Sequence, residues 1–263
     1  MIADFADASF DLIYIDPPFN TGRVVRRVTT RLTRDAKGPR RFGGGRYRAE
    51  STAGVGYADS HDDYLAFLTP RLVEARRLLT ARGSFFLHLD FREVHHAKVR
   101  CDEVFGRRCF VNEIVWAYDY GARSRRRWSP KHDTLLWYAM DPTRYTYRYD
   151  DIDRVPYLAP GLVGPVKAAR GKTPTDVWWQ TIVSPTGKEK TGYPTQKPLK
   201  LLERIVRVHS DPGDRLLDFF AGSGTFGEAA AKHGRNVVLV DEHPEAIATM
   251  RRRLARYSPD VHP

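Results

Sequence analysis

The sequence predicts an α/β fold in which a mostly parallel sheet is covered by helices on both faces. Short apolar runs alternate with longer segments of helical periodicity along most of the chain. Two of the apolar runs, residues 10–15 and 215–220, lead directly into turns rich in proline or glycine. Ligands bind such sheets at the carboxyl ends of the strands, so both turns are candidate functional sites.

The elements can be placed in order along the chain. After the strand at residues 10–15, an amphipathic helix is expected at residues 62–82, split or restarted by Pro70 and stopped by Gly83. Later strands are expected at residues 84–90, 111–118, 134–140, 215–220 and 236–240. Later helices are expected at residues 92–105, 199–209, 225–233 and 244–257. With 263 residues and 41% hydrophobic content, the chain can form a single domain, residues 1–263, around a full core.

The tetrapeptide that follows the first strand, Asp16-Pro17-Pro18-Phe19, can bind an exocyclic amine. The Asp16 carboxylate and the Pro17 carbonyl are neighbouring hydrogen-bond acceptors, and the two prolines stiffen the turn that carries them. Phe19 offers a flat face on which a planar base can stack. An ordinary strand stop can have the same sequence, so the tetrapeptide alone leaves both interpretations open.

A glycine-rich turn at residues 221–225 lies between a strand and the start of a helix, an arrangement typical of a ligand cradle. The turn differs from the dinucleotide-binding fingerprint, because Thr225 directly follows Gly224. Asp241 ends the next strand, where a carboxylate can accept hydrogen bonds from ribose hydroxyls. An ordinary β-α-β unit remains the alternative for this turn.

A third motif, Tyr193-Pro194-Thr195-Gln196-Lys197-Pro198, leads into the expected helix at residues 199–209. The order of the three motifs resembles the β class of S-adenosylmethionine-dependent DNA amino-methyltransferases, in which the catalytic half precedes the cofactor half. The resemblance covers nearly the whole chain and is weakest at residues 23–59 and 141–190. It implies a Rossmann-like class I methyltransferase fold with a circularly permuted motif order.

The resemblance also implies which residues form the site. The catalytic residues would be Asp16, Pro17, Pro18 and Phe19. The residues that hold S-adenosylmethionine would be Asp16, Thr195, Gln196, Lys197, Asp218, Phe219, Ala221, Gly222, Gly224, Thr225 and Asp241. Lys197 is expected near the methionine carboxylate of that cofactor. No metal is expected, since the sequence has no paired Cys or His residues at zinc spacing.

The resemblance implies methyl transfer to the exocyclic amine of a base flipped out of double-stranded DNA. In that family an aspartate at the head of the catalytic motif usually accompanies adenine N6, and a serine usually accompanies cytosine N4. Adenine is therefore expected, together with a role in restriction–modification. Three alternatives stay open: a cytosine-N4 DNA methyltransferase, an RNA or protein amide methyltransferase, and a DNA-binding protein without catalysis.

The net charge of +11 and the pI of about 9.7 favour a polyanionic partner such as DNA. Residues 23–48 hold ten Arg or Lys side chains and one acid, and residues 23–59 are expected to form a mobile basic loop. A second basic cluster surrounds Trp128. A solvated basic surface is the alternative for both. The candidate DNA contacts are Arg26, Arg27, Arg123, Arg125, Arg126, Arg127 and Lys131.

Residues 141–190 are rich in Pro, Gly and polar side chains and have little regular periodicity. Their main apolar patch is Val177-Trp178-Trp179, and the Trp pair favours a folded insertion over a disordered one. This segment is expected to recognise the target sequence in DNA.

Two cysteines, Cys101 and Cys109, are too few for a disulfide framework and fit a reducing compartment. No run is apolar enough for a membrane helix, and residues 1–4 lack the features of a signal peptide. A cytoplasmic, DNA-associated protein is therefore expected.

The residues before the first strand depart from the family pattern. Family members usually carry a Gly-Asp strand there, which lies beside the strand that ends at Asp241 and reaches the adenine of the cofactor. Residues 1–9 contain no Gly-Asp. The strand at residues 239–241 is therefore expected to be a sheet edge, left exposed or covered by a second copy or another partner.

Overall fold

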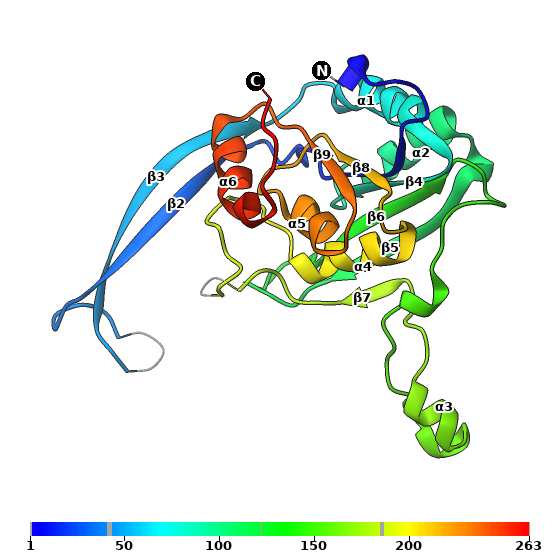
Figure 1. The fold of residues 1–263 in the computed structure, drawn as a ribbon. Coiled ribbons are helices and arrows are strands. Elements are labelled where there is room, and N and C mark those ends of the chain that lie inside the picture. Colours follow the sequence, from blue (N-terminus) through cyan, green and yellow to red (C-terminus); the bar gives the residue numbers. More distant parts are fainter. Residues whose placement is uncertain (1, 41–43, 122, 185–186, 263) are drawn as a thin grey trace.

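The computed structural model describes residues 2–40, 44–121, 123–184 and 187–262, and for residues 25–32, 49 and 51–58 it describes the backbone alone. A seven-stranded mixed sheet forms the centre, in the order β7-β5-β6-β4-β1-β8-β9 (Figure 1). Its strands are β1 (Phe10–Ile15), β4 (Leu79–Leu89), β5 (Phe110–Ala117), β6 (His132–Ala139), β7 (Val177–Trp179), β8 (Arg215–Asp218) and β9 (Asn236–Leu239). The predicted α/β fold is confirmed.

β1 lies inside the sheet and pairs in parallel with β4 on one side and β8 on the other. Five of its six residues are buried, as expected for a strand that is covered on both faces. Parallel strands end at the same edge of a sheet. Asp16, which follows β1, and Asp218, the last residue of β8, are therefore neighbours at the carboxyl edge.

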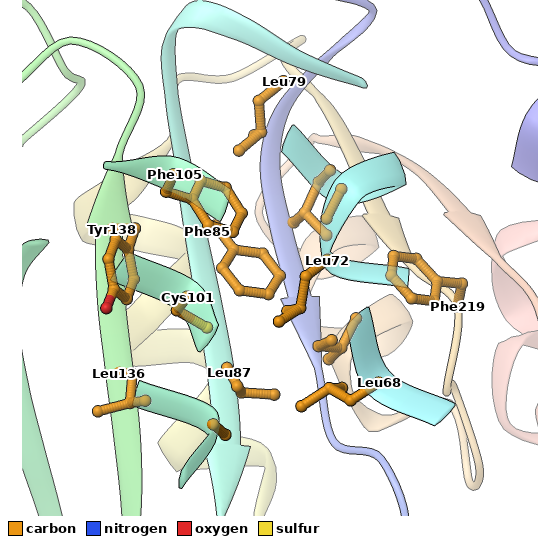
Figure 2. Close-up of a cluster of buried hydrophobic side chains, with 14 of the residues drawn as sticks. Leu68, Leu72, Leu79, Phe85, Leu87, Cys101, Phe105, Leu136, Tyr138 and Phe219 are labelled. Atoms are coloured by element: carbon orange, nitrogen blue, oxygen red, sulfur yellow. The ribbon is translucent and has the colours of Figure 1, made fainter. Parts of the chain in front are cut away.

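Helices cover both faces of the sheet. The helices are α1 (Tyr64–Leu78), α2 (Val94–Phe105), α3 (Pro165–Arg170), α4 (Leu199–His209), α5 (Thr225–Lys232) and α6 (Pro244–Leu254). On one face α1 and α2 pack against β4 and β6 through Leu72, Phe85 and Tyr138 (Figure 2). On the other face α4 and α5 pack on the sheet around Phe86 and Ile205. The two apolar layers fix the strand ends that carry the motifs.

The first helix differs from the expectation at its proline and at its end. α1 continues through Pro70, because packing of its apolar face outweighs the one hydrogen bond that Pro70 cannot make. The Thr69 hydroxyl donates 2.6 Å to the Leu65 carbonyl in the same turn. The chain then enters β4 at Leu79, so Gly83 lies inside a strand and does not stop the helix.

The expected basic loop at residues 23–59 is instead an antiparallel hairpin, here called the arm, formed by β2 (Arg23–Arg34) and β3 (Tyr47–Asp59). β2 is rich in Val and Thr, whose strand propensity overrides the high charge of the segment. The arm extends away from the body of the protein (Figure 1). At about 3.4 Å per residue, its strands of 12 and 13 residues are roughly 40 Å long.

Residues 141–172 lie mainly at the amino edge of the sheet, away from Asp16. The Thr146 amide donates 3.2 Å to the Arg82 carbonyl early in β4, and the Arg148 amide donates 2.8 Å to the Val208 carbonyl near the end of α4. From this edge α3 extends away from the body (Figure 1).

The Trp pair belongs to β7, which joins the sheet in parallel beside β5. Trp178 is buried, and the Arg204 guanidinium lies 4.7 Å from the centre of its ring. Trp179 is 76% exposed at the carboxyl edge. The pair is therefore divided between the core and the surface.

β9 is the last strand of the described sheet and pairs with β8 alone. The predicted sheet edge next to Asp241 is thereby confirmed for the described residues. Val237 and Val238 are half-buried, so this edge presents apolar side chains together with strand backbone. A second copy or another partner covering the edge remains a prediction.

Both cysteines are free thiols. Burial raises the pKa of Cys101, which stays protonated as a packed core side chain. Among the described residues, no group of three His, Cys, Asp or Glu side chains is placed to hold a metal ion. The helices in the described ranges are all too short or too polar to cross a bilayer.

Candidate active site

The three sequence motifs converge on one pocket of about 590 Å³ at the carboxyl edge of the sheet. This volume is within the range of small-molecule sites. The expected site residues that line the pocket are Asp16, Pro18, Thr195, Gln196, Lys197, Asp218, Phe219, Ala221, Gly222, Thr225 and Asp241. Three other expected residues, Pro17, Phe19 and Gly224, lie beside residues that line it without lining it themselves.

Asp16 is the centre of a small cluster of side chains. Its Oδ2 atom accepts a hydrogen bond from Lys197 Nζ, and that ammonium lies 5.0 Å from the centre of the Phe19 ring. Its Oδ1 atom is buried and has no hydrogen-bond partner in the described part of the chain. One oxygen of Asp16 is therefore fixed by Lys197, and the other is a buried acceptor without a partner among the described residues.

The turn that carries Asp16 is held from α1. The Tyr64 hydroxyl donates 2.8 Å to the Pro18 carbonyl. Tyr64 is itself buried, and burial raises the pKa of its hydroxyl, which therefore remains a donor. The prolines and this hydrogen bond together restrict the turn after β1.

The glycine-rich turn forms another wall of the pocket. Gly222 has a φ of +48°, and a Cβ there would lie 3.2 Å from the Tyr193 ring. The amides of Gly222 and His243 donate to the two Asp241 oxygens at 2.8 and 2.9 Å. Gly224 has a packing role, because a Cβ there would lie 2.8 Å from a side chain of α6. It allows close packing against α6 and does not face the ligand space.

Three carboxylates, Asp16, Asp218 and Asp241, line this one pocket. Burial raises the pKa of Asp218 well above its ordinary value, and the charges of Asp16 and Asp241 raise it further. Burial also raises the pKa of Asp241. A ligand that carries positive charge and donates hydrogen bonds would stabilise this group of carboxylates.

We expect Asp218→Asn to raise the thermal stability of the ligand-free protein near neutral pH. A carboxyl with a raised folded-state pKa stabilises most below its unfolded pKa of about 3.9, and this contribution is lost as the pH rises toward the folded value. The uncharged amide of Asp218→Asn avoids that loss. The melting temperature of the variant should therefore exceed that of the wild type, and the difference should grow with pH. Each kcal/mol gained in the free energy of unfolding should raise it by about 2–4 °C.

Thermal melts from pH 5 to pH 8, approximately the range above the unfolded pKa, measure this gain. Asp214→Asn is the matched control, because Asp214 lies just before the other end of β8 and pairs with Arg82. An equal gain in the control would show that the effect is not due to the buried carboxyl of Asp218.

The third motif forms a loop beside the pocket. Thr195 has a φ of +59°, and its hydroxyl donates 2.7 Å to the preceding carbonyl. The Gln196 carboxamide accepts from the Thr191 amide and donates to the Glu189 carbonyl, each at 2.9 Å. Gln196 therefore shapes its own loop. Lys197 is the member of the motif that reaches the Asp16 carboxylate.

The pocket has an aromatic wall that was not predicted from the sequence. His61 and Phe67 stack with ring centres 4.1 Å apart, and the Arg71 guanidinium lies 4.0 Å from the centre of the Phe67 ring. All three line the pocket, and no sequence motif marks them. Tyr193 and Phe220 line it as well, and their positions next to expected site residues could have indicated them.

The basic turn between β5 and β6 lies at the same edge of the sheet as Asp16. Leu89, the last residue of β4, pairs with Thr134 near the start of β6. β4 and β1 are parallel, so the turn at residues 118–131 is next to the carboxyl ends of both. Trp128 in this turn is 98% exposed.

The candidate DNA contacts differ in their exposure and in their ion pairs. Three of them are exposed and form no ion pair within the described residues: Arg125, Arg126 and Arg127. Arg123 pairs with Asp119, and Lys131 is half-buried. Arg26 and Arg27 belong to β2, and their side chains lie outside the described part of the chain.

Solved structures identify the class of fold. The M1.HpyAVI–SAM complex is 22% identical, with a TM-score of 0.59 over 94% of this chain and 89% of that one. The PvuII DNA methyltransferase (cytosine-N4-specific) is 16% identical, with a TM-score of 0.63 over 96% of this chain and 82% of that one. The protein therefore has the Rossmann-like fold of class I methyltransferases.

Sequence comparison identifies the family. Residues 10–252 match the DNA methylase family of N6 and N4 methyltransferases. The type II methyltransferase M.HpaI of Haemophilus parainfluenzae is 27% identical over 96% of this chain and 70% of its own length. The type II methyltransferase M.ScaI of Streptomyces caespitosus is 30% identical over 88% of this chain and 70% of its own length. The DNA adenine methyltransferase YhdJ of Escherichia coli (strain K12) is 27% identical over 94% of this chain and 76% of its own length.

The chain therefore belongs to the S-adenosylmethionine-dependent DNA amino-methyltransferases, and DNA is its substrate. The family predicted from the three motifs is confirmed. The alternatives of an RNA or protein amide methyltransferase and of a DNA-binding protein without catalysis are not supported by this match.

Proposed function

We propose that the protein methylates N6 of adenine in double-stranded DNA and serves in restriction–modification. The aspartate at the head of its catalytic tetrapeptide supports adenine, as does the similarity to a relative named as a DNA adenine methyltransferase. The similarity to relatives named as type II methyltransferases supports the role in restriction–modification.

The observation that carries the proposal is the unpaired carboxylate oxygen of Asp16. Its Oδ1 atom is buried, faces no partner among the described residues, and belongs to a residue that lines the pocket. A buried acceptor without a partner is unfavourable unless a ligand donates to it. The adenine amino group has two N–H donors, one for Asp16 Oδ1 and one for the neighbouring Pro17 carbonyl.

The pocket also suits S-adenosylmethionine, which supplies a methyl group already activated by a positively charged sulfonium. Asp218 and Asp241 carry raised pKa values because of burial, and a cationic donor-rich ligand would stabilise their charged forms. Asp241 would accept from ribose hydroxyls. Gly222 leaves space that a side chain would fill, since a Cβ there would approach the Tyr193 ring.

The residues of the chain contribute mainly orientation. Asp16 Oδ1 and the Pro17 carbonyl hold the amine so that its lone pair points into the pocket, and Phe19 stacks on the base. The amine held in this way would accept the methyl group of S-adenosylmethionine, and the sulfur would leave as a neutral thioether. The nitrogen would then lose one proton to solvent, so Asp16 need not be a strong base. Proximity and orientation of this kind supply most of the rate.

The target base must leave the duplex to reach this pocket, because its amine is inaccessible within the stack. We place the DNA at the carboxyl edge, where the basic turn with Trp128 and the exposed Trp179 are found. The arm, roughly 40 Å long, matches about one turn of duplex, ~34 Å. Within residues 141–190 we assign target recognition to the part after α3.

Labelled methyl transfer to unmethylated phage DNA tests the proposal. The DNA is digested to nucleosides after reaction with S-adenosylmethionine, and the modified nucleoside is identified by mass spectrometry. We expect N6-methyladenosine in its deoxy form. Absence of any methylated base would overturn the proposal. Single-molecule sequencing of DNA from an expressing host would then give the recognition sequence.

The second candidate is a cytosine-N4 methyltransferase. The exocyclic amine of cytosine also has two N–H donors, so Asp16 and Pro17 would serve it equally. The fold is shared with a methyltransferase named as cytosine-N4-specific. Detection of N4-methylcytosine in the same digest would select this candidate.

A further inference from the structure

A buried carboxylate at the root of the arm binds the catalytic turn directly. Asp59 is the last residue of β3 and is 3% exposed. Its carboxylate accepts from the Asn20 amide at 2.7 Å, from the Thr21 amide at 3.1 Å and from the Thr21 hydroxyl at 2.6 Å. Its carbonyl accepts from the Gly22 amide at 2.8 Å. Four hydrogen bonds thus join one residue to three consecutive residues that follow Phe19.

The backbone at this point has the geometry of an anion-binding concavity. Asn20 has a φ of +55° and Gly22 a φ of +69°, so successive N–H groups turn toward the same acceptor. A non-glycine residue in this region costs on the order of 1–3 kcal/mol and persists only when its surroundings fix it. The carboxylate of Asp59 supplies the interaction that holds this conformation.

The Asn20 side chain adds two further connections. Its amide nitrogen donates 2.7 Å to Glu93, next to the start of α2, and its oxygen accepts from the His61 amide at 2.9 Å. His61 lies in the segment before α1. The residue after Phe19 is therefore fixed from β3, from the approach to α1 and from the approach to α2.

We propose that Asp59 is a positioning residue for methyl transfer, which links the arm to the catalytic turn. Phe19 directly precedes Asn20, so the position of Asn20 determines where the Phe19 ring and the Pro17 carbonyl point. This inference rests on the proposed function, since it assigns Asp59 a task in orienting the target base. Asp59 does not line the pocket, so we assign it no direct contact with the base or the cofactor.

Asp59→Ala should reduce kcat for methylation of unmethylated phage DNA by about tenfold to a hundred-fold, because small displacements at a reacting centre have effects of this size. Because the cofactor wall of the pocket is untouched, the dissociation constant for S-adenosylmethionine should stay within about twofold. Asp59→Asn keeps one acceptor oxygen and should give an intermediate kcat.

Hydrogen exchange provides a measure that does not depend on activity. The amides of Asn20, Thr21 and Gly22 donate to Asp59, so exchange across residues 19–22 should accelerate in Asp59→Ala. Asp102→Ala is the matched control. Asp102 belongs to α2, where its carboxylate accepts from Lys98 Nζ and from the Tyr138 hydroxyl at 2.7 Å each. This control should change neither kcat nor exchange at the turn.

The outcomes separate the inference from the proposed function. A wild-type protein that methylates no DNA would overturn the proposed function. An active wild type with an equally active Asp59→Ala would overturn only the inference, as would a parallel loss of cofactor affinity and kcat. If Asp59→Ala does not fold, Thr21→Val removes the 2.6 Å hydrogen bond alone and should lower kcat about threefold, with cofactor affinity unchanged.

Discussion

We expect Asp16→Ala to lower DNA methylation about a hundred-fold or more, because a preorganised acceptor aimed at the reacting group is worth a few kcal/mol in the transition state. The Oδ1 atom is the buried acceptor to which the amine of the base would donate a hydrogen bond. Binding of S-adenosylmethionine should change much less, since Asp218, Asp241 and the glycine-rich turn are intact. Single-turnover methylation and calorimetric cofactor binding measure the two effects separately.

The pairing with Lys197 makes the choice of variant important. Lys197 is 7% exposed, and Asp16→Ala leaves its ammonium without this partner. Breaking a buried pair in this way costs about 3–5 kcal/mol of stability. Asp16→Asn keeps the shape and one acceptor oxygen, so it should fold more stably than Asp16→Ala and still lose most of the methylation rate.

Asp11→Asn is the matched control on the same strand. Asp11 lies near the amino end of β1, where its carboxylate accepts from Thr80 and Arg215 at 3.1 Å each. It should affect stability but not the rate of methyl transfer at saturating substrates. Near-normal activity in both Asp16 variants would refute the catalytic assignment of Asp16.

The combined substitution of Arg125, Arg126 and Arg127 by alanine should weaken DNA binding and flatten its salt dependence. The logarithm of the binding constant should fall less steeply with the logarithm of salt concentration, by roughly 0.9 for each phosphate that the variant no longer neutralises. The three side chains are exposed and, within the described residues, free of ion pairs, so their removal breaks no internal ion pair there. Fluorescence anisotropy with duplex DNA over a salt series gives this slope.

The double substitution of Arg107 and Arg108 by alanine is the control, because it removes two positive charges away from the basic turn. Both residues are exposed and lie just before β5, at the amino edge of the sheet. Their removal should leave the slope almost unchanged. A slope in the triple variant equal to that of the wild type would show that the basic turn is ordinary surface charge.

The local motifs allowed the central site to be predicted from sequence. Asp16, Asp218 and Gly222 each follow or end an apolar run, and parallel strands bring such positions to one edge of the sheet. The sheet edge at β9, seen among the described residues, could be predicted as well, because residues 1–9 contain no Gly-Asp pair.

Contacts between distant segments could not be predicted in this way. Lys197 and Asp16 are 181 positions apart, and only the folded chain brings the ammonium to the carboxylate. Asp59 carries no motif, and the charge of residues 23–48 concealed the Val and Thr residues that form β2. The aromatic wall of His61 and Phe67 depends on how α1 packs, which local patterns do not encode.

Among the described residues, the hydrogen bonds between Asp59 and residues 20–22 join the arm to the body of the protein. Insertions or deletions in register, two residues at a time on the distal hairpin, would therefore change its reach without moving the catalytic turn. If the arm lies along DNA as proposed, such changes would alter the length of DNA that the enzyme covers without altering its chemistry. For the same reason, the outer hairpin is a natural position at which to graft a foreign DNA-reading element and redirect methylation to new sites.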